Sequence, residues 1–185
     1  ETEDQQSFVA PHWAYKFRSP EELPTRFGWH GCTIRTDNFW WVEIGGLNHS
    51  IRDAEVIRDE LMKIGYGVAD YIKNYYPGKA GIQNWALEWI GSLPGKRENI
   101  RYVGEHVLTQ NDVQAGGDFA DRVAYGGWPM DDHHPAGLLY PGHPTIFHRA
   151  PCPYGIPFRS LYSKSVPNLL FAGRNISATH SAMAS

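Results

Sequence analysis

A long amphipathic helix in the first half of the chain constrains the fold more than any other feature of the sequence. Apolar residues recur there at spacings of three and four, which places them on one face of a helix. They are Ile51, Ala54, Ile57, Leu61, Ile64, Val68, Ile72 and Tyr75. The pattern predicts a helix over residues 51–76, with Ser50 as its N-cap, Asp53 completing a variant of the capping box and Pro77 ending it. We expect a sheet to cover the apolar stripe.

Two glycines interrupt this predicted helix. Gly65 and Gly67 each cost about 1 kcal/mol relative to alanine in a helix interior. They indicate either a close contact with a neighbouring segment or a break into two helices.

The other elements are shorter. Alternation of apolar residues, or runs of strong β-formers, predict strands over residues 13–17, 39–44, 102–108, 123–128 and 169–172, the last of them buried. A short helix is expected over 82–90, Thr109 is expected to cap a turn, and a last helix is expected to begin at Ser177 as its N-cap. The Pro- and His-rich stretch 129–157 is expected to be a loop or a hairpin. This mixture predicts the α+β class.

Composition and charge exclude several classes of protein. The 185 residues, 42% hydrophobic and 20% charged, are typical of one globular domain and not of a disordered chain. The net charge of −3 provides no phosphate-neutralising surface, so we expect no nucleic-acid partner. No apolar run approaches the ~18 residues that span a bilayer, and the acidic first residues are not a signal peptide. We therefore expect a soluble protein without a membrane partner, and its compartment stays open.

No complete catalytic motif is present. The chain contains no G-x-G-x-x-G, no Walker loop, no G-x-S-x-G and no H-E-x-x-H. Two carboxylates and four histidines do gather in the second half, namely Asp131, Asp132, His133, His134, His143 and His148. Such a group could bind zinc or iron. Adjacent residues rarely share one metal, however, and a polar loop gives the same pattern, so we predict no metal site.

Asp131 and His133 are the candidate catalytic residues of this group. They stand two residues apart, so in an extended segment their side chains point to the same face. Asp131 could then orient His133 and raise its basicity, as general-base chemistry near neutral pH requires. His134 would face the opposite way and matter less.

The stretch 166–182 is the most specific part of the sequence. A predicted strand leads into Gly173 and Arg174, and then into the expected helix start at Ser177. The unpaired N–H groups of a helix N-terminus favour an anionic group, and a glycine lets a ligand approach the backbone closely. An ordinary strand–turn–helix connection would give the same pattern.

Five motifs in the chain carry a resemblance to a known family. They are R-x-x-G-x-x-x-L-T-x-x-D at 101–112, P-x-D-x-H at 129–133, I-P-x-R-S-L at 156–161, N-L-L-x-A-G-R at 168–174 and S-x-T-H-x-A at 177–182. Together they resemble the FAD-dependent oxidoreductases of the glutathione-reductase-like superfamily, in particular the group named xanthan lyase-like. The resemblance covers roughly residues 40–185, and its C-terminal motifs are the most specific.

The resemblance implies an FAD cofactor and hydride transfer between a small organic substrate and the flavin. The residues that it places at the flavin are Gly173, Arg174, Ser177, Thr179 and His180. Arg174 would hold a pyrophosphate or ribityl oxygen, with a surface salt bridge as the alternative, and His180 could instead be a packed helix-face histidine. Asp131 and His133 would lie on the substrate side, where His133 takes a hydroxyl proton.

The family also has a Rossmann unit that holds the ADP half of FAD, and no Gly-rich turn of that kind occurs here. We therefore expect an internal fragment that is inactive alone. Residues 1–160 would be a partial substrate-binding domain, a sheet with covering helices. Residues 161–185 would be one strand and a truncated helix of an FAD-binding domain.

Two other functions stay open. Aromatic residues make up 14% of the chain, and Trp40, Trp41 and Trp128 could stack on a carbohydrate-like substrate, although buried packing is their more common use. The chain could therefore be a free-standing carbohydrate-binding or interaction module. The third reading is a His/Asp metal-dependent hydrolase. The two cysteines, Cys32 and Cys152, could form one disulfide.

Overall fold

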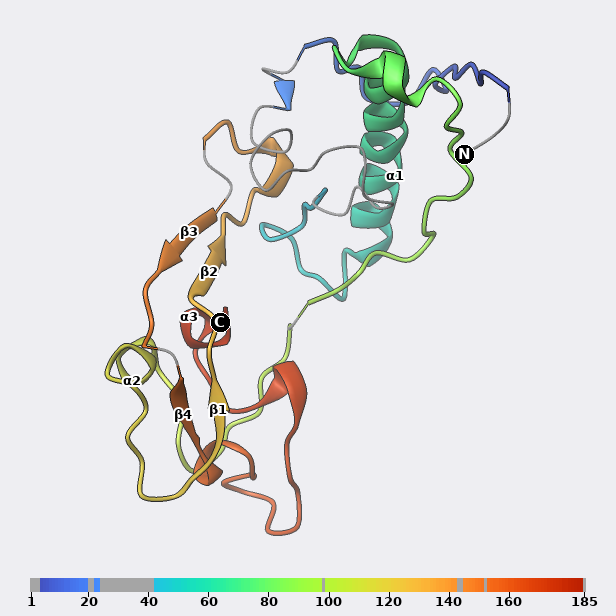
Figure 1. Ribbon diagram of the computed structural model, residues 1–185. Helices are drawn as coiled ribbons and strands as arrows, with labels where there is room; N and C mark the ends of the chain where they lie inside the picture. The colour runs from blue at the N-terminus through green and yellow to red at the C-terminus, as the bar shows by residue number, and fades with distance from the viewer. Residues whose placement is uncertain are drawn as a thin grey trace. The chain divides into compact units, whose positions relative to one another are not determined.

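A computed structural model describes residues 4–19, 22–23, 42–97, 99–142, 145–151 and 153–184. The chain has the predicted α+β class, with helices and two small antiparallel sheets (Figure 1). It divides into two compact units. Unit 1 comprises Glu1–Gly95 and Pro135–Pro144, and unit 2 comprises Lys96–His134 and Thr145–Ser185. None of the helices in these described ranges is long and apolar enough to cross a membrane.

Some predictions fall on residues outside the described part of the chain. These residues are Cys32, Phe39, Trp40, Trp41, His143 and Cys152. Residues 42–44 are described and have irregular backbone, so that end of the predicted strand 39–44 is wrong.

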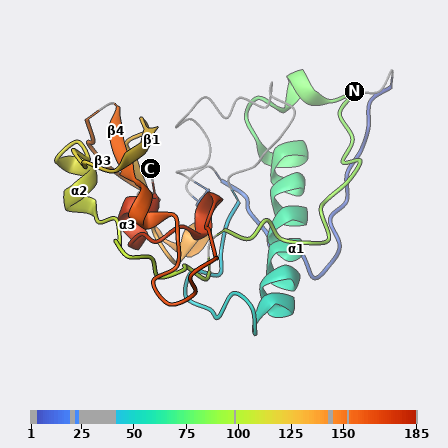
Figure 2. The same cartoon turned by 90° about the horizontal axis from the view of Figure 1, so that it is seen from below.

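The long helix of unit 1 is confirmed. α1 spans Ala54–Asp70 and continues as a π-helical turn over Tyr71–Tyr75. Its buried face packs with the N-terminal segment, which lies beside the helix in Figure 2, and the core residues of this unit are Phe17, Leu23, Ile64, Val68 and Tyr71. Among the described residues of unit 1, segments without β-structure contact the apolar stripe.

α1 begins directly after Asp53, whose side chain makes no capping hydrogen bond to the helix. This residue is the N-cap, and its carboxylate accepts a hydrogen bond from the His49 backbone N–H at 3.0 Å. Hydrogen bonds from the Arg52 side chain and from the His49 backbone hold the pKa of the Asp53 carboxyl below its usual value. A negative charge at this position also suits the helix dipole. The prediction that Ser50 caps the helix is therefore wrong.

Gly67 is needed for a close contact between α1 and the N-terminal segment. A Cβ atom at this position would overlap the carbonyl oxygen of Tyr15 and lie 2.9 Å from its carbonyl carbon. The Tyr15 N–H donates to the Lys63 carbonyl oxygen of the same helix at 3.1 Å. A Cβ at Gly65 would instead meet the Ile90 side chain at 3.5 Å, an ordinary contact. The helix is thus continuous, and only one of its two glycines is required by packing.

The strand predicted at residues 13–17 is absent. These residues form turns and irregular backbone. Their aromatic alternation reflects contact with α1, because the Tyr15 N–H bonds to the helix and not to a second strand.

The helix predicted at residues 82–90 is also wrong. A 3₁₀ turn ends at Ile82, and the backbone from residue 85 onward is irregular. The Lys73 ammonium group explains this, because it donates to the carbonyl oxygens of Ile82, Gln83 and Trp85 at 3.2, 2.9 and 2.7 Å. Carbonyl groups that a helix would use for its own ladder converge on one side chain instead.

Unit 2 contains two antiparallel strand pairs. β1 Arg122–Gly126 pairs with β4 Tyr154–Pro157, and β2 Met130–His133 pairs with β3 Thr145–His148 (Figure 1). The strand predicted at 123–128 is confirmed, beginning one residue earlier. The stretch 129–157 was predicted to be a loop or a hairpin, and the pairing of β2 with β3 shows that it forms a hairpin.

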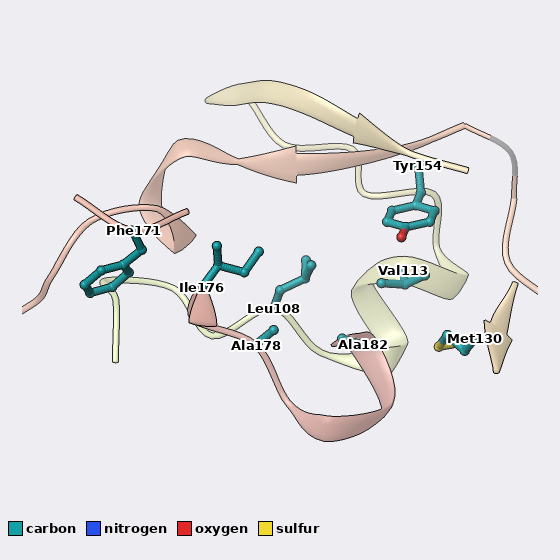
Figure 3. Packing of buried hydrophobic residues seen from close by; sticks show 8 residues of the cluster. All are labelled: Leu108, Val113, Met130, Tyr154, Phe171, Ile176, Ala178 and Ala182. Carbon is teal, nitrogen blue, oxygen red and sulfur yellow. The ribbon is translucent and has the colours of Figure 1, made fainter. Parts of the chain in front are cut away.

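One hydrophobic cluster holds unit 2 together (Figure 3). It joins side chains from α2 Gln110–Gln114, α3 His180–Met183, β2, β4 and the segments between them. Its members are Leu108, Val113, Met130, Tyr154, Phe171, Ile176, Ala178 and Ala182. Because most of these residues lie in short or irregular elements, this cluster contributes more than any single sheet to the stability of the unit.

Residues 102–108, predicted to be a strand, do not pair with a neighbouring strand over several residues. The segment makes only isolated bridges, from Gly104 to Ser163 and from Leu108 to Ala178. Its extended backbone is held by single contacts to several segments instead of by one neighbouring strand.

The buried strand predicted at residues 169–172 is wrong as well. Leu170 is 69% exposed and forms one bridge, to Tyr162, whereas Phe171 is only 6% exposed. The apolar run therefore marks a single core residue, Phe171, and not a strand buried on both faces.

The cap predicted at Thr109 is confirmed as a full capping box on α2. The Thr109 hydroxyl accepts the Asp112 N–H at 3.3 Å, and the Asp112 carboxylate accepts the Thr109 N–H at 2.8 Å. Burial raises the pKa of the Asp112 carboxyl, but hydrogen bonds from Thr109 and from His106 outweigh it, so this pKa lies below its usual value. The T-x-x-D part of the first motif is thus a helix start.

We expect Gly67→Ala to lower the free energy of unfolding by about 1–3 kcal/mol, because the added methyl group overlaps the Tyr15 backbone. Gly65→Ala is the matched control and should raise it by about 0.5–1 kcal/mol through helix propensity. Urea unfolding followed by far-ultraviolet circular dichroism measures both. Stabilisation by both substitutions would contradict the close contact.

We expect Asp112→Asn to lower stability at pH 7 by about 0.5–2 kcal/mol, the usual loss for a helix cap. A carboxyl whose pKa is lower in the folded state stabilises the protein above its unfolded value of ~3.9, and this contribution is lost as the pH falls through the folded value. The variant and the native chain should therefore converge in stability at about pH 2.

The control is Asp118→Asn, since the Asp118 side chain is 98% exposed. It should change stability by less than about 0.5 kcal/mol at either pH. A difference between Asp112→Asn and the native chain that is the same at neutral and acid pH would show that the Asp112 charge is not the stabilising feature.

Candidate active site

Three of the five sequence motifs meet at Gly104 in unit 2. A Cβ atom there would lie 2.7 Å from the Arg159 carbonyl oxygen and 2.9 Å from Ser177 Cβ, so a side chain at this position would displace both. The Ser177 N–H donates to the Ser160 carbonyl oxygen at 3.0 Å, and the Ser177 carbonyl oxygen accepts the Leu108 N–H at 2.9 Å. These contacts define what we term the Gly104 junction. It explains why the first, third and fifth motifs occur together.

The arginine of the I-P-x-R-S-L motif supports the fold. Arg159 Nε and Nη2 donate to the two carboxylate oxygens of Asp121 at 3.0 and 3.1 Å, a bidentate pair. The pairing holds the pKa of the Asp121 carboxyl below its usual value. This motif residue therefore orders the loop before β1 rather than a ligand.

The predicted pairing of Asp131 and His133 is present on β2. His133 Nε2 lies 3.3 Å from Asp131 Oδ2, and the two side chains are 18% and 25% exposed. The Thr145 hydroxyl of β3 donates to the other carboxylate oxygen, Asp131 Oδ1. The prediction that Asp131 and His133 share one face of an extended segment is thus confirmed. A partly buried imidazole held by a fixed carboxylate can accept a proton from a bound hydroxyl group.

Asp132 forms a second Asp–His pair, which the sequence did not reveal. Its Oδ1 atom lies 2.9 Å from His180 Nε2, and Arg101 Nη2 lies 3.2 Å from His180 Nδ1. An arginine N–H can only donate, so Nδ1 accepts and Nε2 carries the proton that is donated to Asp132. The side chain of His180 is 61% exposed, so it is not a packed core histidine.

β2 carries residues of both pairs, on opposite faces. The Asp131 N–H donates to the Ala184 carbonyl oxygen at 2.8 Å, which ties β2 to the end of α3. Alternation along the strand places Asp131 and His133 on one face and Asp132 on the other. Strand periodicity is the signal that could have identified Asp132, because it puts this residue on the same face as Met130. Met130 is fully buried and belongs to the core cluster, as does Ala182.

Gly173 and Arg174 lie in an exposed turn. Gly173 has φ +70°, a left-handed conformation that favours glycine, and no atom lies within 4 Å of where its Cβ would be. The Arg174 guanidinium makes no hydrogen bond or ion pair to any described residue, so the alternative of a surface salt bridge is not realised within that part of the chain.

Ser177 does not cap the last helix. Thr179 is the N-cap of α3, whose four residues begin at His180. Ser177 is 1% exposed, and its hydroxyl oxygen has no hydrogen-bond partner among the described residues. A buried hydroxyl group left unpaired costs about 1–3 kcal/mol. Ser177 therefore belongs to the Gly104 junction, and the expected helix start at this residue is wrong.

The described residues contain no group of His, Cys, Asp and Glu side chains that could hold a metal ion. For FAD, three observations fit the flavin-side residues. Gly173 leaves open space at its backbone, the Arg174 cation is available, and the Ser177 hydroxyl is buried without a partner. The short α3 supplies little helix dipole, and the chain has no Gly-rich turn for the ADP half of the cofactor.

Comparison with known proteins identifies the family of the chain. The model of the FAD dependent oxidoreductases matches residues 3–185. No curated protein and no solved structure is significantly similar to the chain. Oxidoreductase chemistry with FAD as the cofactor is the general property of the matching family. Because the match extends over nearly all residues, the chain belongs to the FAD dependent oxidoreductase family.

Proposed function

We propose that this chain is the substrate-facing part of a larger FAD-dependent oxidoreductase, together with one edge of its flavin site. Family membership over residues 3–185 supports the chemistry. The 185 residues contain no G-x-G-x-x-G turn, which the ADP half of FAD needs. This supports the assignment of the chain to one part of the enzyme. By its motifs the enzyme falls in the glutathione-reductase-like superfamily, in the group named xanthan lyase-like.

In this proposal residues 1–160 belong to the substrate-binding domain and residues 161–185 to the FAD-binding domain. The chain by itself is then inactive, since it holds only one edge of the cofactor site. The motif at 168–174 lies within the FAD-binding part and carries Gly173 and Arg174.

The proposed reaction is hydride transfer between a hydroxyl-bearing organic substrate and flavin. Bound FAD supplies the hydride acceptor. His133 Nδ1 takes the hydroxyl proton, while Asp131, paired with Nε2, orients the imidazole and stabilises its charged form. The observation that carries this assignment is the 3.3 Å separation of His133 Nε2 and Asp131 Oδ2. The hydrogen bond from Thr145 to the same carboxylate supports it, because a fixed carboxylate fixes the imidazole.

Residues near the exposed turn would hold the flavin. We assign this role to Gly173, Arg174, Ser177, Thr179 and His180. Arg174 supplies a cation for a phosphate or ribityl oxygen, and the left-handed Gly173 gives the ligand access to the backbone. The contacts of His180 with Asp132 and Arg101 hold its imidazole in one orientation.

The substrate in this proposal is a small molecule, with a carbohydrate-like compound as the first candidate. Trp128, two residues before β2, has a side chain that is 64% exposed, and an exposed indole can stack on a sugar ring. The proposal includes neither a nucleic acid nor a membrane as partner.

The decisive substitution is His133→Ala in the complete flavin-loaded enzyme. We expect it to lower the rate of flavin reduction by substrate by about 10²-fold or more, the usual scale for loss of a general base. Flavin content should stay near the native value, because His133 is assigned to the substrate side. Stopped-flow absorbance at the flavin band measures the rate directly.

His134→Ala is the matched control, since His134 is the neighbouring histidine and stands one position off the period-two face of Asp131 and His133. Flavin reduction at the native rate in His133→Ala, or a larger loss in His134→Ala, would refute the assignment. A purely anchoring role of His133 would lower thermal stability while leaving the turnover of folded molecules unchanged.

Arg174→Ala should have the opposite effect and lower flavin occupancy first. We expect loss of one charge-assisted hydrogen bond, worth about 1.5–3 kcal/mol, to weaken FAD binding roughly tenfold or more. Arg149→Ala removes another exposed arginine of unit 2 and serves as the control. The ratio of flavin to protein absorbance after gel filtration reports the result, and equal occupancy in both variants would remove Arg174 from the site.

A further inference from the structure

A cleft of about 340 Å³ lies in unit 1 between the N-terminal segment and the end of α1. Its volume is within the range of about 300–1,000 Å³ that is usual for small-molecule sites. The polar groups that line it come from His12, Lys16, Arg18, Asp70, Asn74 and Tyr75. We propose that this cleft binds a small organic anion, whose carboxylate or phosphoryl oxygens meet the cationic side chains. None of the candidate active-site residues lines it.

The charge balance of the cleft favours an anion. Its lining includes one carboxylate, Asp70, and both oxygens of that group are already engaged. Asp70 Oδ2 accepts Arg18 Nη1 at 2.9 Å, and Asp70 Oδ1 accepts Asn74 Nδ2 at 2.7 Å. The Asp70 side chain is only 10% exposed, so its charge is compensated within the wall. The positive charge of Lys16 is left to attract a ligand.

Arg18 is held in place with donors to spare. Both of its side-chain hydrogen bonds to described residues use Nη1, to Asp70 Oδ2 and to the Phe17 carbonyl oxygen. The guanidinium carbon also lies 4.1 Å from the centre of the Tyr75 ring. The N–H groups of Nε and Nη2 donate to no described residue. A planar guanidinium fixed on one side presents the geometry that recognises two anionic oxygens at once.

Lys16 completes the cationic lining, and His12 adds an imidazole to it. Both side chains are exposed and neither makes a hydrogen bond or ion pair to a described residue. An ammonium group on a flexible stem adds a point charge without fixing the geometry. Lys16 can therefore be substituted without breaking an internal contact, which makes it the best probe of the site.

The cleft is formed before any ligand arrives. Asn74 Nδ2 donates to the Phe8 carbonyl oxygen at 3.1 Å, and the Ala14 N–H donates to the Pro11 carbonyl oxygen at 3.0 Å. The same segment is held against α1 by the close approach at Gly67. A pre-formed wall lowers the entropic cost of binding. The apolar side chains of Phe8, Val9 and Ala14 line the rest of the cleft and suit the non-charged part of the ligand.

The test uses residues 1–185 and three probes of similar shape: benzoate, phenyl phosphate and uncharged benzyl alcohol. Each is titrated into isotopically labelled protein at low ionic strength, and amide shifts are followed by NMR. We expect at least one anion to bind about tenfold more tightly than benzyl alcohol, with shifts confined to residues 8–18 and 70–75. Tighter binding of benzoate identifies a carboxylate ligand, and tighter binding of phenyl phosphate identifies a phosphoryl ligand.

Two lysine variants make the result specific. Lys16→Gln should weaken anion binding about fivefold and Lys16→Arg should restore it, whereas Lys164→Gln, an exposed lysine of unit 2, should have no effect. Raising the salt to about 0.5 M should also weaken binding. Equal binding of benzyl alcohol, equal effects of Lys16→Gln and Lys164→Gln, or no shifts at about 10 mM anion would overturn the proposal. Because no flavin is needed, failure here would leave the proposed oxidoreductase function untouched.

Discussion

The absence of a side chain at Gly104 is the constraint on which unit 2 depends. Only because nothing extends from this residue can the backbone of Arg159 and the side chain of Ser177 approach it within van der Waals distance. The hydrogen bonds from Leu108 to Ser177 and from Ser177 to Ser160 then align three segments that are far apart in the sequence. Two-stranded sheets are marginal in water on their own, so this alignment, together with the shared hydrophobic cluster, gives the unit its order.

The parts of the fold that follow from local physics could be predicted from the sequence. The spacing of apolar residues identified α1, and the Thr109–Asp112 pair identified the start of α2, because both depend on residues within one or two turns. Among the described residues, the strand predictions succeeded only at β1, and there over part of 123–128. Residues 13–17 have the alternation of a strand but lie against a helix. In the apolar run 169–172, Phe171 is the residue whose ring is buried in the core. Alternation of apolar residues predicts that one face of a segment is buried, but it does not predict which element covers that face.

In the candidate site, too, the features that depend on nearby residues could be predicted, and those that depend on distant residues could not. Strand periodicity was enough to place Asp131 and His133 on one face, since both residues lie on one element. The pair formed by Asp132 and His180 joins residues 48 positions apart, and no spacing rule reaches that far. Ser177 was misread for a related reason: its position before a short helix suggests a cap, while its burial comes from contacts with distant segments. Several motif residues of this family turn out to stabilise the fold, and Arg159 with its Asp121 partner is the clearest case.

The hydrogen bond from Asp131 to the Ala184 carbonyl oxygen has a consequence for how the two sides of the site communicate. β2 is bonded to β3 along one edge and to the end of α3 along the other, so it has no freedom to shift while both remain in place. In the proposed assignment, a ligand at His180 and a ligand at His133 would both act on groups tied to β2. By thermodynamic linkage, any coupling between the two would be reciprocal and of the same factor in both directions.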